Sequence, residues 1–121
     1  MQLPQRKRTD TRMTDDLRHV PLCRCDEVEE GACRQVVLPG RKPLVVFRLD
    51  GAFHVLDDTC THGNAFLSEG DVVDHQVFCP FHSGAFDIRT GEATVAPCVK
   101  PLRRYPAVVV DGVVHGDLSE R

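Results

Sequence analysis

The sequence of 121 residues contains no tryptophan and a single tyrosine, and none of its apolar runs is long enough to cross a bilayer. A transmembrane helix needs about 20 mostly apolar residues, so we expect no membrane-spanning segment and no membrane partner. The polar, basic start of the chain is not followed by an apolar stretch, so we expect no secretion signal. A chain of this length is expected to form one domain around one core.

Long helices and nucleotide-binding fingerprints are also missing. No segment has the period of a helix as long as ten residues, and no G-x-G-x-x-G pattern marks a flavin or nicotinamide site. The chain instead alternates short β-branched runs with turn signals, of which Asp50-Gly51 and Asp111-Gly112 are two-residue hairpin signals. From Val20 the pattern is strand, turn, strand. The strands expected with defined bounds are Arg34–Leu38, Leu44–Leu49, Phe53–Leu56, Gln76–Cys79, Ala85–Ile88, Ala107–Val110 and Val113–His115.

These patterns predict an antiparallel all-β fold with two or three sheets. Helical turns are expected only at Asp26–Glu30 and Phe66–Glu69. Residues 1–13 are expected to be a disordered basic tail, and residues 14–121 a single domain. The basic run at residues 6–8 is a weak signal for nucleic-acid binding, and we expect no nucleic-acid partner.

Two short motifs pair cysteine with histidine, C-x-H at Cys60 and His62 and C-x-x-H at Cys79 and His82. Thiolate and imidazole are the donors of iron–sulfur and zinc sites. Zinc modules usually separate their ligands into a cysteine pair and a histidine pair, whereas each motif here is mixed. The spacing therefore favours an iron–sulfur cluster, with a zinc-stabilised interaction module as the alternative.

The residues around these motifs resemble the Rieske proteins, and more closely their small soluble ferredoxins, which serve aromatic-ring-hydroxylating dioxygenases. The resemblance rests on C-T-H-G-N-A and L-S-E-G within residues 60–70, on C-P-F-H and G-A-F-D-I-R-T-G within residues 79–91, and on a proline loop at residues 96–106. It implies a Rieske-like β-sandwich or barrel with a small inserted cluster-binding lobe at about residues 58–90.

The resemblance also implies one [2Fe-2S] cluster, in which two histidines replace two cysteines on one of the irons. By this resemblance Cys60 and Cys79 hold one iron, while His62 and His82 hold the other. The other four cysteines, Cys23, Cys25, Cys33 and Cys98, are expected to be small apolar fillers in a reducing cytoplasm. Cys98 lies in the loop expected near the cluster, but the two ligand pairs are complete without it.

So small a cluster protein is expected to carry electrons and to have no catalytic residues. Ring-hydroxylating oxygenases add a mononuclear iron held by two histidines and a carboxylate, whereas the remaining histidines here, His19, His54, His75 and His115, are scattered singly. We therefore expect a soluble, monomeric ferredoxin that takes single electrons from a flavin-dependent ferredoxin reductase and passes them to a terminal oxygenase. The small Rieske-like subunit of a nitrite reductase is the alternative.

Lysine and arginine are absent between Leu49 and Ile88, where seven acids occur: Asp50, Asp57, Asp58, Glu69, Asp71, Asp74 and Asp87. These acids either form a docking face for basic partners or are solvated residues of which some, such as Asp57, Asp58 and Asp87, serve turns.

High-potential Rieske proteins carry a disulfide and two hydroxyl donors at positions that match Ala65, Phe81, Gly84 and Phe86. This chain lacks all of these groups, so its potential is expected at the low end of the Rieske range, roughly −150 mV.

Overall fold

The structure is a computed structural model that describes residues 18–61, 63–81 and 83–119. The described residues form eleven strands and two short 3-10 helices, η1 (Cys25–Glu27) and η2 (Leu67–Glu69), with no α-helix. No helix among them has the length and apolar character needed to span a bilayer. The expected all-β fold is confirmed, and the expected tail at residues 1–13 lies outside the described residues.

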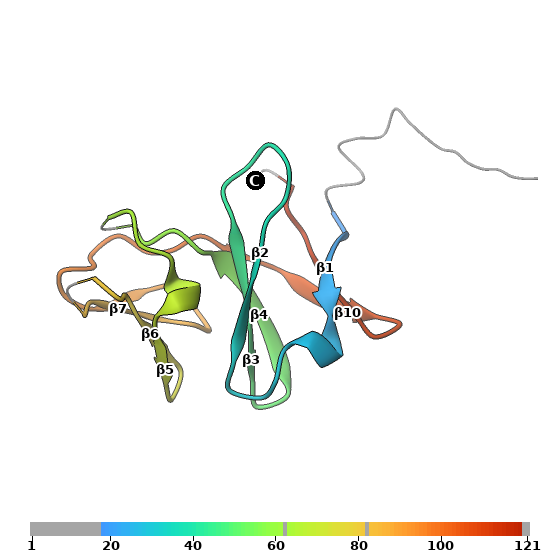
Figure 1. Cartoon of the computed structure of the whole chain (residues 1–121), viewed down its shortest axis with the longest axis horizontal. Helices are drawn as coiled ribbons and strands as arrows, with labels where there is room; N and C mark the ends of the chain where they lie inside the picture. The colour runs from blue at the N-terminus through green and yellow to red at the C-terminus, as the bar shows by residue number, and fades with distance from the viewer. Residues whose placement is uncertain (1–17, 62, 82, 120–121) are drawn as a thin grey trace, which may run out of the picture.

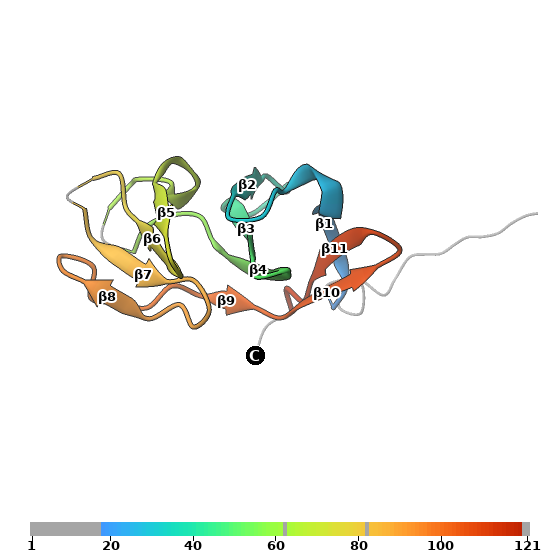
Figure 2. The ribbon, with the colours of Figure 1, turned by 90° about the horizontal axis from the view of Figure 1, so that it is seen from below.

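The strands form three antiparallel sheets, which follow one another along the molecule (Figures 1 and 2). The terminal sheet has the order β1-β11-β10 and contains β1 (Val20–Arg24), β10 (Ala107–Val110) and β11 (Val113–Gly116). The central sheet has the order β2-β3-β4-β9 and contains β2 (Cys33–Val36), β3 (Leu44–Leu49), β4 (Ala52–Asp57) and β9 (Arg104–Tyr105). The lobe sheet has the order β5-β6-β7-β8 and contains β5 (Asp71–Val73), β6 (Gln76–Phe78), β7 (Ala85–Asp87) and β8 (Ala93–Val95).

Both predicted hairpins are present, and their turn residues explain them. Asp50 and Gly51 join β3 to β4 with φ angles of 53° and 78°, and Asp111 and Gly112 join β10 to β11 with φ angles of 53° and 77°. Positive φ at both central residues is the mark of a type I′ turn, whose twist matches that of the flanking strands. Aspartate and glycine are among the residues that adopt this conformation most readily.

Strand β3 lies between two hydrophobic cores. Val45 and Phe47 belong to the core shared with the lobe, whereas Leu44 and Val46 belong to the core under the terminal sheet, and all four are fully buried. Successive side chains of a strand point to opposite faces, so one continuous apolar run can fill both cores. This strand therefore joins the lobe rigidly to the rest of the domain.

Candidate metal centre

Cys60 and Cys79, the two predicted cysteine ligands, are brought together at the lobe. Cys60 follows β4 and Cys79 follows β6, and each is only 3% exposed. Burial raises the pKa of the Cys79 thiol, the Phe81 backbone N–H lowers it, and a hydrogen bond and charge interaction with Cys60 raise it further. Both cysteines belong to the same buried core cluster. His62 and His82 lie outside the described residues.

The loop that carries Cys60 is closed by a buried carboxylate. Asp58 is fully buried, and it accepts hydrogen bonds from the Ser68 N–H (2.6 Å), the Ser68 hydroxyl (2.7 Å) and the Gln35 side-chain amide (2.7 Å). The Leu67 N–H also donates to the Asp58 carbonyl oxygen, at 2.7 Å. Asp58 therefore ties the two ends of the first ligand loop together, and it does not belong to any exposed acidic face.

The second ligand loop is closed by its own backbone. The Cys79 N–H donates to the Gly84 carbonyl oxygen at 2.7 Å, and Ser83 turns the chain with a φ of 60°. A Cβ atom at position 84 would lie 2.5 Å from the Cys98 Sγ and 3.0 Å from the Cys98 nitrogen. Only glycine fits there, because the loop at residues 96–106 approaches so closely.

A third thiol lies at the same place. The Sγ atoms of Cys98 and Cys60 are 3.8 Å apart, and Cys98 is 4% exposed. Burial raises the pKa of the Cys98 thiol to about 12, with further contributions from a hydrogen bond to Cys60 and from the charges of Cys60 and Cys79. The expectation that Cys98 is merely an apolar filler missed this contact, because the sequence does not show which residue the proline loop covers.

These residues fit half of a two-iron cluster. Two buried thiols from separate loops offer the pair of cysteine ligands that one iron of a Rieske cluster requires, and binding would release their protons. The described residues contain no group of three or more His, Cys, Asp or Glu side chains that could hold a metal ion.

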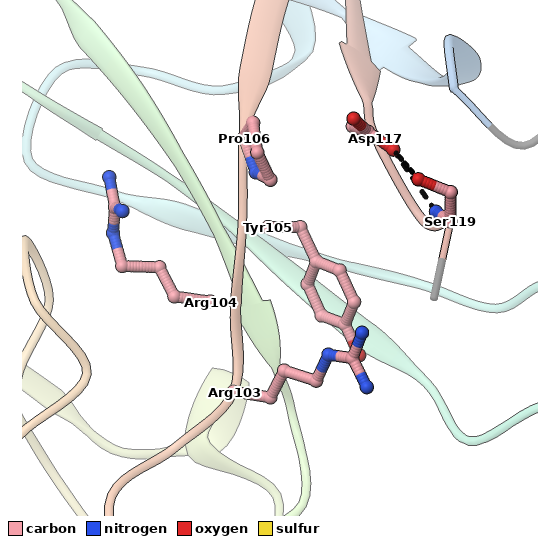
Figure 3. A pocket seen from close by; sticks show the side chains of 6 residues that line it. All are labelled: Arg103, Arg104, Tyr105, Pro106, Asp117 and Ser119. Carbon is pink, nitrogen blue, oxygen red and sulfur yellow. Dashed lines mark hydrogen bonds between the residues drawn. The ribbon is translucent and has the colours of Figure 1, made fainter. Parts of the chain in front are cut away.

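Tyr105 connects the end of the proline loop to the start of the first ligand loop. Its hydroxyl donates to Asp57 Oδ1 at 2.7 Å and accepts from Arg41 Nη2 at 2.9 Å. The guanidinium carbons of Arg41 and Arg103 lie 5.4 and 5.2 Å from the ring centroid, within the range of cation–π contacts. Figure 3 shows Arg103 beside the ring, while Arg104 points away from it. Burial, followed by the hydrogen bond to Asp57, raises the pKa of Tyr105 to about 12.

The seven acids between Leu49 and Ile88 divide into two groups in the structure. Asp57 and Asp58 are hydrogen-bonded as described, Asp50 contacts His75 at 2.8 Å, and Asp87 accepts from the Arg89 backbone and side chain. Asp87 forms a local pair, as the second interpretation expects, whereas Asp57 and Asp58 bond to residues remote in sequence and Asp58 is not solvated. Glu69, Asp71 and Asp74 are exposed along η2, β5 and the following turn. Asp50 is exposed as well but is paired with His75, so the docking-face hypothesis rests mainly on the other three.

Comparisons with known proteins show the family of the chain. The model of the Rieske [2Fe-2S] domain family matches residues 18–106. The ferredoxin component of the p-cumate 2,3-dioxygenase system of Pseudomonas putida is 43% identical over 101 residues, which is 83% of this chain and 86% of the relative. The anthranilate 1,2-dioxygenase ferredoxin subunit of Burkholderia cepacia is 46% identical over 97 residues, which is 78% of this chain and 87% of the relative.

A solved structure has the same fold. The chain resembles the ferredoxin in a complex of reduced oxygenase and oxidized ferredoxin in carbazole 1,9a-dioxygenase, with a TM-score of 0.82 and 35% identity, covering 87% of this chain and 97% of that one. The expected Rieske fold and single Rieske-type [2Fe-2S] cluster are confirmed, and the relatives are electron-carrying ferredoxin components, not oxygenases. The chain belongs to the Rieske [2Fe-2S] domain family, within its ferredoxins of aromatic-ring dioxygenase systems.

Proposed function

We propose that this ferredoxin carries single electrons from a flavin-dependent ferredoxin reductase to the terminal oxygenase of an aromatic-ring dioxygenase system, as a monomer in the cytoplasm. The observation that carries the proposal is the burial of Cys60 and Cys79 in one core cluster, in a chain whose relatives are such ferredoxin components. The same similarity favours this role over that of a nitrite reductase subunit.

The proposed ligands are Cys60 and Cys79 on one iron and His62 and His82 on the other. When bound, the cluster supplies a one-electron couple. The two buried cysteines hold it away from water, while Asp58 and Gly84 keep their loops in place. We also propose that residues 1–13 are a tail, that residues 14–121 are one domain, and that the cluster-binding lobe spans about residues 58–90, although its sheet continues to Val95.

Two apolar side chains lie beside the cysteines and are open to a partner. Phe81, two residues after Cys79, is 53% exposed, and Val99, next to Cys98, is 78% exposed. Exposed apolar groups of this size that flank a buried centre are suited to a protein contact. They support electron exit at this end of the lobe, where a partner can approach the cluster closely.

The function can be tested in a reconstituted electron-transfer chain. Cluster absorbance would be followed while NADH and the flavin reductase of a related dioxygenase system reduce the protein, and again after its terminal oxygenase and aromatic substrate are added. We expect fast reduction and substrate-dependent reoxidation. A cluster that the reductase reduces no faster than NADH alone, or that the oxygenase does not reoxidise, would contradict the proposed function.

The three exposed acids are expected to speed the encounter with a basic partner. Neutralising them together (Glu69→Gln, Asp71→Asn and Asp74→Asn) should lower the second-order rate of electron transfer severalfold at low salt and leave the reduction potential nearly unchanged. Asparagine is chosen at position 74 because Asp74 has a φ of 56°, a conformation that asparagine tolerates.

The matched control for this test is Asp111→Asn, at the tip of the β10–β11 hairpin in the terminal sheet. Its rate should equal that of the wild type. Stopped-flow absorbance at several ionic strengths measures both variants. A wild-type rate that does not fall as salt is added would leave the three acids as ordinary solvated residues.

The reduction potential is expected at roughly −150 mV, the low end of the Rieske range. Phe86 is fully buried and Gly84 has no side chain, so neither offers the hydroxyl that stabilises the more negative reduced cluster in high-potential relatives. Phe86→Tyr should raise the potential, with Phe53→Tyr on β4 as the control. Position 84 is unsuitable for this test, because any side chain there would collide with Cys98. Voltammetry of the wild type at above about +100 mV would contradict the expectation.

A further inference from the structure

The thiol of Cys98 lies beside Cys60, one of the proposed cluster ligands. It reaches Cys60 from 38 residues further along the chain, with 3.8 Å between the two sulfurs. Gly84 leaves the space that Cys98 fills, since a Cβ atom there would lie 2.5 Å from the Cys98 Sγ. The thiol is thus held in one place by the second ligand loop and faces the sulfur of the first.

The direction of the hydrogen bond follows from the chemistry of a ligand. In the thiol pair alone either sulfur can donate. A cysteine bound to iron is a thiolate and has no proton, so within this pair only the Cys98 S–H can then donate. The acceptor sulfur becomes more negative when the cluster is reduced, so the hydrogen bond is stronger in the reduced state.

We propose that the Cys98 thiol donates a hydrogen bond to the Cys60 sulfur and thereby raises the reduction potential of the cluster. The inference rests on the proposed ligand role of Cys60. Cys98 would then be a weak hydrogen-bond donor in a chain that has no hydroxyl donor at positions 84 and 86. Cys98 acts through Cys60 and is not one of the four proposed ligands.

Two substitutions separate a donor from a filler. Cys98→Ala removes the donor, and Cys98→Ser replaces it with a stronger one. With alanine, the ratio of reduced to oxidised protein at a fixed electrode potential should fall by at most about fivefold, which would be the effect if a typical hydrogen bond were made only in the reduced state. That ratio corresponds to about 40 mV for a one-electron couple, for which a tenfold change is 59 mV. The serine variant should lie at or above the wild type.

Cys23 is the matched control, because it is a buried cysteine (8% exposed) in the core under the terminal sheet. Cys23→Ala and Cys23→Ser make the same chemical changes away from the lobe, and both should keep the wild-type potential. If Cys98→Ala and Cys98→Ser both shift the potential by the same amount in the same direction, packing alone explains the effect and the proposal is overturned.

Infrared spectroscopy gives a second measurement, the S–H stretching frequency, which should not depend on the redox state if Cys98 only fills space. One S–H stretching band of the wild-type holoprotein should shift to lower frequency when the cluster is reduced. The shifting band should persist in Cys23→Ala and be absent from Cys98→Ser. If Cys98→Ala does not retain the cluster, Cys98→Ser and the wild-type spectrum decide the question.

The outcomes also distinguish this inference from the proposed function. Suppose that the partners reduce and reoxidise the wild-type protein while its S–H bands stay the same in both redox states and the Cys98 variants keep the wild-type potential. That result would overturn only the hydrogen bond. A Cys60→Ser protein whose cluster spectrum and potential equal those of the wild type would contradict the ligand role on which both rest.

Discussion

The His62→Cys protein is expected to have a reduction potential at least tens of millivolts below that of the wild type. A thiolate carries a negative charge where an imidazole is neutral, and extra negative charge on the ligands disfavours the more negative reduced cluster. The shift should point toward the all-cysteine range, near −400 mV in plant-type ferredoxins. Voltammetry of the purified holoprotein measures it.

The control for this variant is His19→Cys, which makes the same substitution at an exposed residue next to β1. Its potential should match the wild type. A His62→Cys protein that assembles a cluster with an unchanged potential would show that His62 is not bound to iron. His82→Cys offers an independent repeat, because His82 is the second proposed histidine ligand.

Replacing Asp58 with alanine is expected to lower the free energy of unfolding by about 1–3 kcal/mol. The substitution deletes a fully buried acceptor of three short hydrogen bonds. It leaves the Ser68 N–H, in a partly buried residue, without its acceptor, and an unsatisfied buried donor costs about 1–3 kcal/mol. The Gln35 side chain belongs to an exposed residue, so its amide can bond to water instead. The loop that carries Cys60 should open more often, so the variant should also lose its cluster faster.

Chemical denaturation, followed by circular dichroism and by cluster absorbance, tests this expectation. The matched control is Asp71→Ala, an exposed aspartate in the same lobe, which should change the unfolding free energy by no more than about 0.5 kcal/mol. Asp58→Asn keeps an oxygen acceptor and should fall between the two. An Asp58→Ala protein as stable as Asp71→Ala would show that the hydrogen bonds to Asp58 do not hold the loop.

The parts of the fold that the sequence predicted are those determined by local chemistry. Both Asp-Gly turns were predicted because two adjacent residues adopt positive φ, and β3 and β10 have the predicted bounds. The helical turns are present as η1 and η2. Strands β5, β8 and β9 were not predicted, since two or three residues show no periodicity. Their pairing depends on partners elsewhere in the chain. Strands β6 and β7 are equally short, but the apolar segments on either side of the second cysteine–histidine motif indicated them.

In the site, too, the features set by nearby residues were predicted and those set by remote residues were not. The cysteine and histidine spacing, together with the resemblance, was enough to propose the four ligands. The roles of Asp58 and Cys98 could not be predicted, because each depends on residues remote in sequence: Asp58 on Ser68 and Gln35, Cys98 on Cys60. In the sequence Asp58 is one of seven acids and Cys98 one of four spare cysteines, and only the packing of the loops distinguishes them.

Electron paramagnetic resonance of the reduced protein tests the central claim most directly. A cluster held by Cys60, His62, Cys79 and His82 predicts a red-brown protein whose reduced form gives a rhombic signal with an average g value below that of the free electron. Pulsed measurements on that signal should detect couplings to imidazole nitrogen, which His62→Cys and His82→Cys should each reduce. A colourless, EPR-silent protein with stoichiometric zinc, or a cluster signal without nitrogen couplings, would contradict the claim.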